Sequence, residues 1–236
     1  MKWRLLGGLA FLSLAFPVMA QQSQMEGYLN SGSDAERVQK LLSLGAKRES
    51  AELLSGGELK WREIRSDSPQ EMALLFAPCG SFYGSSLYLL KSTDHGWRIV
   101  DDVGFDCHYD NNVSFEVVSL RRPNVDDVLV HHECEEHGTG FVKQNFNGFA
   151  IVSSKFRLVL NTEEIVKASG WPGGGELDQQ SAFVTMPTTR ARSGIIEETR
   201  NSKENGNLTV EKRDFRWSKM RFRFIRSKFV KVKQSG

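Results

Sequence analysis

The chain has 236 residues, of which 10% are aromatic, and it carries 31 basic and 29 acidic side chains. This length and aromatic content suit one domain with an ample hydrophobic core, alone or with a short extension. Beyond the N-terminus no stretch is apolar enough to cross a bilayer, which excludes a membrane-spanning helix there. The near-balance of charge hides an asymmetry, because the segment from Glu211 onward holds ten basic and two acidic side chains. The C-terminal segment is therefore basic and the rest of the mature chain acidic.

Residues 1–20 have the pattern of a secretory signal peptide. Lys2 and Arg4 form a positive start, and residues 5–16 form an apolar core that is short for a membrane anchor, the alternative interpretation. No cysteine follows the apolar core, so no lipid attachment is expected. We expect cleavage near Ala20 and export to the periplasm or the extracellular space, with no transmembrane span in the mature form. The compact signal indicates a bacterial source.

Residues 21–57 are predicted to form a short helical extension and a linker. Ser33 and Asp34 can cap a helix, because their side-chain oxygens accept hydrogen bonds from the free N–H groups of a first turn. Apolar residues at helical spacing then continue to Leu44, and Gly45 is a plausible stop. This pattern predicts one short helix that packs on a sheet or mediates a contact.

Residues 58–236 are predicted to form a single β domain of about three repeats. The clearest repeat covers residues 113–164, where β-branched and aromatic runs alternate with turn residues, as in four antiparallel strands. A similar pattern precedes it at residues 58–103, and a weaker one follows at residues 182–229. Residues 128–130 are apolar on both faces, which suits a strand buried on both sides. The predicted fold is mainly β, with about three antiparallel four-stranded blade-like sheets in a partial propeller or a curved sandwich.

The central repeat resembles blade repeats of the FG-GAP/VCBS type in exported bacterial proteins. The similarity lies in the run at residues 127–132, the glycines of residues 138–140 and the two strands of residues 149–160. It implies a β-propeller, a fold that in those families often carries calcium in its loops. The calcium loops are absent here, and three repeats are too few for an ordinary closed propeller, so an open stack of three sheets fits the length as well.

One segment of the central repeat concentrates side chains that can carry chemistry: His131, His132, Cys134 and His137. On an extended strand His132 and Cys134 point to one side and His131 to the other. Histidine and cysteine are ligands for zinc or copper, so these four residues are candidate metal ligands. Neither a CxxC pair nor an HExxH motif is present. Surface loop residues without a specific role are the alternative.

The three cysteines, Cys79, Cys107 and Cys134, are predicted to lie at one end of the fold, because each follows a strand that runs toward that end. Exported proteins meet an oxidising compartment, so we expect one disulfide and one remaining thiol. The sequence does not choose the pair, although a Cys79–Cys107 bond is slightly favoured because it would join loops of one repeat.

The basic C-terminal segment alternates aromatic and cationic residues around Phe222 and Phe224. A strand there would place the aromatic side chains inward and the basic ones outward. Such a face can simply be the solvated side of an edge strand, where positive charge deters edge pairing. It also predicts a patch for anionic polymers or lipid headgroups, and not for nucleic acid, which an exported protein rarely meets. The candidate anion-binding residues are Arg216, Lys219, Arg221, Arg223, Arg226 and Lys228.

The sequence contains no nucleophile elbow, SxxK motif or phosphate-binding glycine loop. Acidic neighbours such as Asp126 and Asp127 face opposite ways on a strand, so we interpret them as solvated turn charges. The sequence therefore favours a non-catalytic binding or structural role in the cell envelope, without a cofactor, and with envelope proteins or anionic polymers as partners. The alternative is a metal-binding protein or metal-dependent enzyme centred on the histidine cluster.

Overall fold

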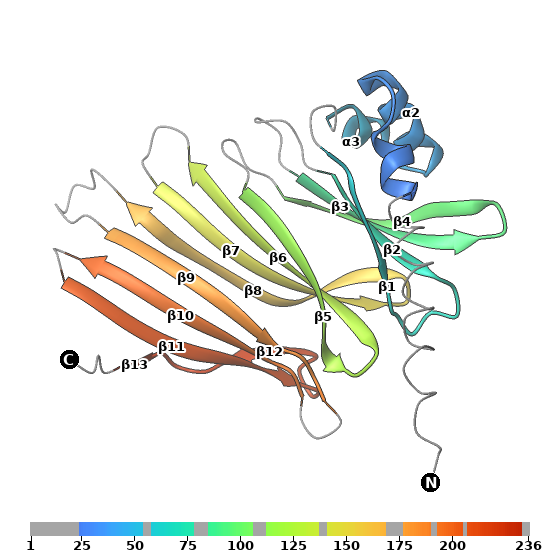
Figure 1. Cartoon of the computed structure of the whole chain (residues 1–236). Helices are drawn as coiled ribbons and strands as arrows, with labels where there is room; N and C mark the ends of the chain where they lie inside the picture. Colours follow the sequence, from blue (N-terminus) through green and yellow to red (C-terminus); the bar gives the residue numbers. More distant parts are fainter. Residues whose placement is uncertain are drawn as a thin grey trace, which may run out of the picture.

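The computed structural model describes eight stretches of the chain: residues 24–53, 58–77, 85–105, 112–136, 141–168, 177–189, 193–204 and 207–232. Within them the protein is mainly β, with antiparallel strands in three successive groups, preceded by short helices (Figure 1). This confirms the predicted fold class. The segment predicted to be the signal peptide lies outside the described residues.

The first sheet contains four strands in chain order. β2 is buried at all six positions, because one face of the sheet is covered by helices and the other by the next sheet. A strand covered on both faces must be apolar throughout rather than alternating. The strands are β1 (Lys60–Ile64), β2 (Met72–Ala77), β3 (Ser85–Thr93) and β4 (Gly96–Phe105).

The helical region packs against the outer face of this first sheet. It comprises residues 24–30, α2 (Asp34–Ser43) and α3 (Arg48–Leu53), so it is longer than the single helix predicted. Ser33 caps α2 as expected, since its Oγ accepts a hydrogen bond from the Glu36 N–H at 3.4 Å and the Glu36 carboxylate accepts one from the Ser33 N–H. Leu41 is the buried residue of α2 and joins the core beneath the helices.

The middle sheet is buried on both faces. Val128 and Val130 point into the core shared with the first sheet, whereas Leu129 points into a second core on the opposite face. All three side chains are at most 2% exposed, which confirms the interpretation of residues 128–130 as a strand covered on both sides. The strands are β5 (Asn112–Arg122), β6 (Val125–Glu136), β7 (Phe141–Val152) and β8 (Lys155–Ala168).

The third group of strands continues the hydrogen-bonded ladder of the middle sheet but packs against its back. β8 and β9 pair only at Lys167 with Asp178 and Ala168 with Leu177. Core residues from the middle and third groups, including Leu129 and Ile196, are packed together in one cluster. The strands are β9 (Leu177–Met186), β10 (Ile195–Glu204), β11 (Asn207–Ser218), β12 (Arg223–Arg226) and β13 (Val230–Lys231), the last of which pairs with β11.

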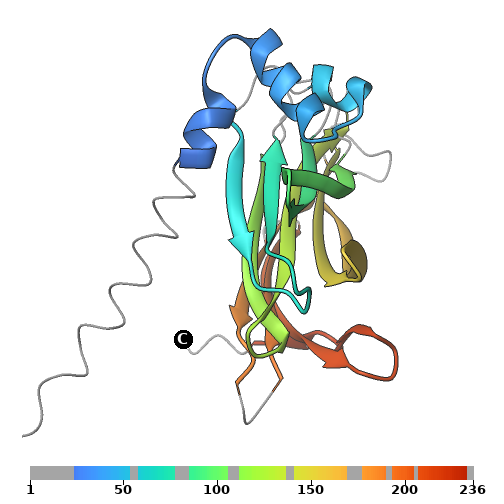
Figure 2. The same cartoon turned by 90° about the vertical axis from the view of Figure 1, so that its right-hand side faces the viewer.

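The three sheets therefore form an open stack, and polar contacts join their edges. The connection between β9 and β10 is attached to β5, because the Thr188 N–H donates to the Ser119 carbonyl and the Gly194 N–H donates to the Leu120 carbonyl, at 2.7 and 2.9 Å. In Figure 2 the helices lie at the top of the molecule, and the β11–β12 hairpin, in red, projects outward near the bottom. The β5–β6 turn also lies toward that lower end, so turns of the middle and third groups come near each other there (Figure 2).

Candidate functional site

The two neighbouring histidines of β6 lie in different interfaces. His132 is buried toward the first sheet, where its ring makes an edge contact with Phe105 at a centroid distance of 6.0 Å. His131 faces the third sheet, with its ring 6.2 Å from that of Phe183. Because a strand projects neighbours to opposite faces, the middle sheet separates the two imidazoles rather than bringing them together.

Cys134 lies two residues beyond His132 on β6 and is disulfide-bonded. The other predicted members of this region, Cys79, Cys107 and His137, lie outside the described residues. Within the described stretches no group of three or more His, Cys, Asp and Glu side chains is arranged to hold a metal ion. The metal-centred hypothesis therefore has no assembled ligand set in the part of the chain that the structure describes.

A buried polar network joins the middle and third sheets around His131. The imidazole Nε2 lies 2.6 Å from Nε2 of Gln144, and the Gln144 amide donates to the Ser181 carbonyl at 3.2 Å. The Ser181 hydroxyl donates to Glu198, and Arg213 donates to the other oxygen of that carboxylate, at 2.9 and 2.6 Å. Burial lowers the pKa of His131, and Glu133 opposes the shift.

This network contains a serine, a histidine and a carboxylate, but their arrangement differs from a nucleophilic triad. In a triad the histidine accepts the hydroxyl proton and the carboxylate orients the histidine. Here the Ser181 hydroxyl donates directly to Glu198, and the His131 ring contacts Gln144. The geometry instead ties β6, β7, β9, β10 and β11 together across the interface between two sheets.

A cleft of about 740 Å³ at the turn end of the stack is a candidate site that combines residues from all three sheets. Its walls come from all three sheets: the β1–β2 connection, the β5–β6 and β7–β8 turns, and the β11–β12 turn. Volumes of this size are typical of sites for small molecules, which are lined by apolar and aromatic surface with a few polar groups. The residues that matter for its chemistry are Arg121, Ile151, Val152, Trp217, Lys219 and Phe222.

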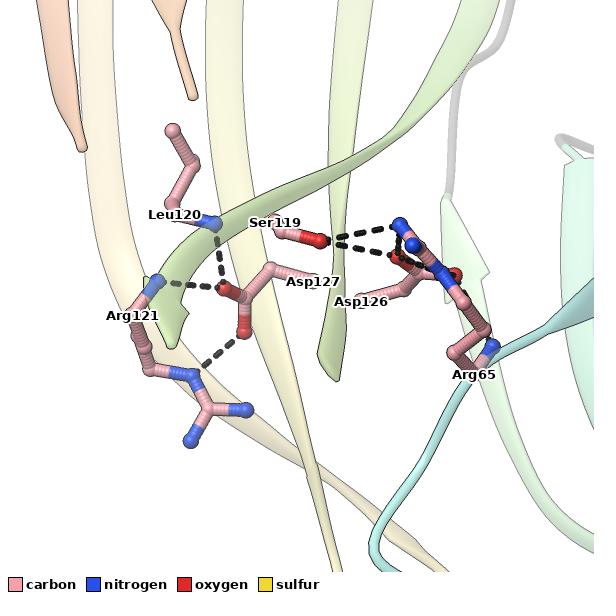
Figure 3. Close-up of polar contacts among 6 residues, drawn as sticks. All are labelled: Arg65, Ser119, Leu120, Arg121, Asp126 and Asp127. Carbon is pink, nitrogen blue, oxygen red and sulfur yellow. Dashed lines mark hydrogen bonds and ion pairs between the residues drawn. The ribbon is translucent and has the colours of Figure 1, made fainter. Parts of the chain in front are cut away.

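Two buried aspartates follow each other in β6, and the second of them, Asp127, binds Arg121 of the cleft wall (Figure 3). Asp127 accepts hydrogen bonds from the backbone N–H groups of Leu120 and Arg121, at 3.1 and 3.0 Å, and from Nε of Arg121. Asp126 points the other way and pairs with Arg65 of the first sheet, whose Nη2 lies 2.7 Å from Oδ1. The interpretation of these carboxylates as solvated turn charges is wrong, because each is at most 5% exposed and has its own arginine.

Arg121 itself is held by Asp127 at one edge and by aromatic rings nearby. Its guanidinium carbon lies 5.6 Å from the Trp217 ring centroid and 5.7 Å from that of Phe222, distances typical of cation–π contacts. Trp217 and Phe222 meet edge to face at 5.1 Å. Phe222 occupies the turn with a φ of 48°, a conformation that non-glycine residues adopt only when the surrounding structure supports it.

The predicted anion-binding residues are distributed around the β11–β12 hairpin. Arg216 is paired with Asp214 at 3.0 Å, whereas the remaining candidates are exposed and form no ion pair with the described residues. Lys219 lines the cleft described above, and three others line a neighbouring groove of about 470 Å³ beside Leu158. The hairpin thus places cationic side chains on two sides. The exposed candidates are Lys219, Arg221, Arg223, Arg226 and Lys228.

No family model matches the chain, and neither a curated protein nor a solved structure matches it. The resemblance of the central repeat to FG-GAP/VCBS blades consequently remains a prediction. No helix in the described stretches is long and apolar enough to cross a membrane.

Proposed function

We propose that this protein is an exported, non-catalytic binding protein of a bacterial envelope, and that the cleft at the turn end of the stack holds its ligand. The observation that carries the proposal is the composite origin of the cleft: turns from all three stacked sheets contribute to its lining. Turns anchored on packed sheets are the usual location of binding residues, because the scaffold fixes positions that the turns alone could not hold.

The contacts beside the cleft support a preformed site. Arg65 reaches from the first sheet to Asp126 of the middle sheet, and Arg121 of the middle sheet packs on Trp217 of the third. Each sheet is thereby connected to its neighbour next to the cleft. A site whose walls are already positioned loses less conformational freedom when a ligand binds.

Export and a disulfide belong to the same proposal. Residues 1–20 have the signal-peptide pattern, and an oxidising destination would preserve the bond at Cys134. Protein secreted from a bacterial host should begin near Gln21, and peptide mapping without reductant should find the Cys134 peptide joined to a second cysteine peptide. An N-terminus that retains Lys2 would contradict export through cleavage.

The binding role is tested by screening a fragment set of neutral, cationic and anionic compounds by NMR. The indole N–H of Trp217 is the reporter, assigned by comparison with Trp217→Phe. We expect some fragments to shift this signal without shifting that of Trp61, which lies in the first sheet under the helices. If no fragment of any charge shifts the Trp217 signal, the cleft is not a ligand site and the proposal fails.

The groove beside β12 favours a second candidate function, the binding of anionic polymers. Arg221, Arg223 and Arg226 line it together with Leu158, which is 51% exposed. Several exposed cations along one groove suit a polyanion more than a single small ligand. Binding of a polyuronate such as alginate should weaken with salt and be lost when Arg221 and Arg223 are both changed to Glu. Unchanged binding by that variant would reject this function.

A further inference from the structure

The cleft at the turn end contains a buried cation whose hydrogen-bonding capacity is not fully used within the described residues. The Arg121 side chain is 4% exposed, and its Nε donates to Asp127. Its Nη2 is buried and has no hydrogen-bond partner among the described residues. A buried donor without a partner is costly, so native structures normally satisfy such groups with protein, water or ligand.

The other charges at the cleft leave an excess of positive charge. Asp127 is already occupied by Arg121, and Asp67 is paired with Arg122 at the rim. Lys219 and Arg157 contribute two further cations at the cleft and its Phe222 wall, and neither forms an ion pair in the described part of the chain. An anion entering the cleft therefore meets the charges of Lys219 and Arg157, which no carboxylate of the described residues neutralises.

The remaining lining is apolar. Ile151, Val152, Trp217 and Phe222 come from two different hairpins and face the same space as the arginine. A cleft with cationic groups at one end and an apolar wall beside them suits a ligand with a charged head and an apolar body. A strongly hydrated inorganic anion would gain little from this wall.

We propose that the cleft binds a small organic oxyanion, with a carboxylate or phosphate head bound by the terminal nitrogens of Arg121 and by Lys219, and an apolar body against Trp217 and Phe222. This rests on the proposed function and specifies its ligand class. Arginine is suited to this task because its planar guanidinium presents several donors to the oxygens of one carboxylate or phosphate.

The test compares three probes of the same shape: 2-naphthoate, its uncharged analogue 2-naphthamide, and 2-naphthyl phosphate. Dissociation constants are measured by titration with NMR detection at Trp217. At least one of the two anions should bind at least about tenfold more tightly than the amide, since charge-assisted hydrogen bonds are substantially stronger than neutral ones. The carboxylate and phosphate arms identify which head the site prefers.

Two variants locate the effect. The double change Arg121→Gln with Asp127→Asn removes both buried charges together while retaining hydrogen-bonding groups of similar shape, so the fold is kept and the advantage of the anions over the amide should disappear. Lys219→Ala should weaken anion binding several-fold. Lys203→Ala is the matched control, because Lys203 is exposed on β10 near the β10–β11 turn, away from the cleft, and it should change nothing.

The outcomes separate the two proposals. If naphthamide binds as tightly as both anions, or if the double variant keeps the anion preference, the oxyanion proposal is overturned while the binding role of the cleft stands. If neither anion shifts the Trp217 signal at millimolar concentration but neutral fragments do, the oxyanion proposal also fails alone. If no compound of any charge does so, both proposals fail.

Discussion

Asp127 and Asp67 both pair with arginines of the β5–β6 hairpin, but their surroundings differ. The side chains of Asp127 and Arg121 are 1% and 4% exposed, whereas those of Asp67 and Arg122 are 56% and 52% exposed. Removing one partner of a buried pair costs about 3–5 kcal/mol, whereas an exposed pair contributes about 0–1 kcal/mol. Asp127→Asn should therefore lower the free energy of unfolding, measured in urea, far more than Asp67→Asn does.

Removing the Arg121 charge as well should recover part of the unfolding free energy that Asp127→Asn loses. Burial raises the pKa of Asp127, although Arg121 and the backbone N–H groups of Leu120 and Arg121 act in the opposite direction. The buried charge is thus itself a cost, which is removed when both charges are removed. The double variant with Arg121→Gln and Asp127→Asn should be more stable than Asp127→Asn alone. If the effects of the two single changes simply add, the residues do not act as a pair.

Gly194 lies in close contact with the backbone of β5, to which its N–H donates a hydrogen bond at the Leu120 carbonyl. A Cβ added there would lie 2.8 Å from both the Cα and the carbonyl oxygen of Leu120, which are backbone atoms that cannot move aside. Gly194→Ala should reduce the free energy of unfolding by about 1–3 kcal/mol, the usual range for overpacking. Gly104→Ala is the control, because a Cβ at Gly104 meets nothing within 4 Å. Equal stability of the two variants in thermal denaturation would show that the contact between Gly194 and Leu120 leaves room for a methyl group.

At the scale of elements, β6 carries a pH-dependent contribution through His131. Burial between two sheets lowers the folded-state pKa below the ordinary value of 6.5, so the unfolded chain binds the proton more readily. The contribution of the neutral His131 to the free energy of unfolding should be fully present above about pH 6.5. It should be lost as the pH falls through the folded-state pKa. His131→Gln should remove this part of the slope, measured as the urea midpoint between neutral and mildly acidic pH.

Three carboxylates lie around His131 and remain in place in the His131→Gln variant. Glu133 lies on the same strand, Glu116 lines the same small cavity from β5, and Glu198 is linked through Ser181 from β10. Glu133 favours the protonated imidazole and therefore opposes the lowering of the His131 pKa by burial. An unchanged acid slope in His131→Gln would assign the slope to other groups.

The strands were predictable because their signal is local. The strands of the three repeats, including the doubly buried run at residues 128–130, follow from apolar periodicity and turn residues within a few positions. The third group has five strands rather than the four predicted, because the short β13 pairs with β11. The helical region was only partly predictable. The capping signal at Ser33 identified α2, whereas α3 contains residues 48–53, a largely polar stretch whose helical form follows from packing on the first sheet.

The site was much less predictable, because its contacts join distant parts of the chain. Asp126 becomes a buried partner only when Arg65, 61 residues away, reaches it from another sheet. Arg121 likewise gains its aromatic neighbours from a hairpin nearly a hundred residues later. Sequence reasoning did identify the basic hairpin that contains Lys219. It could not indicate that one side of that hairpin closes a cleft, since this depends on how the three sheets stack.

At the scale of the whole molecule, the doubly covered middle sheet should make unfolding cooperative. The hydrogen-bonded ladder between β8 and β9 is short, with only two paired positions, so it does not by itself prevent the third group from opening separately. Opening would expose Ile196, Phe215 and Phe224 together with their partners on the middle sheet. Each such side chain contributes about 1.5–3 kcal/mol when buried, so the loss approaches the 5–15 kcal/mol that is typical of total domain stability.

We therefore expect hydrogen-exchange pulse labelling across a urea gradient to show one midpoint for β2, β6 and β11. Phe215→Ala should lower that midpoint for all three strands equally, because the core that it damages is shared with the middle sheet, which in turn supports the first. Leu75→Ala, in the core beneath the helices, should shift the three midpoints together in the same way. Loss of protection in β11 at lower urea than in β2 would instead show that the third group unfolds independently, and the cleft between the sheets would then open with it.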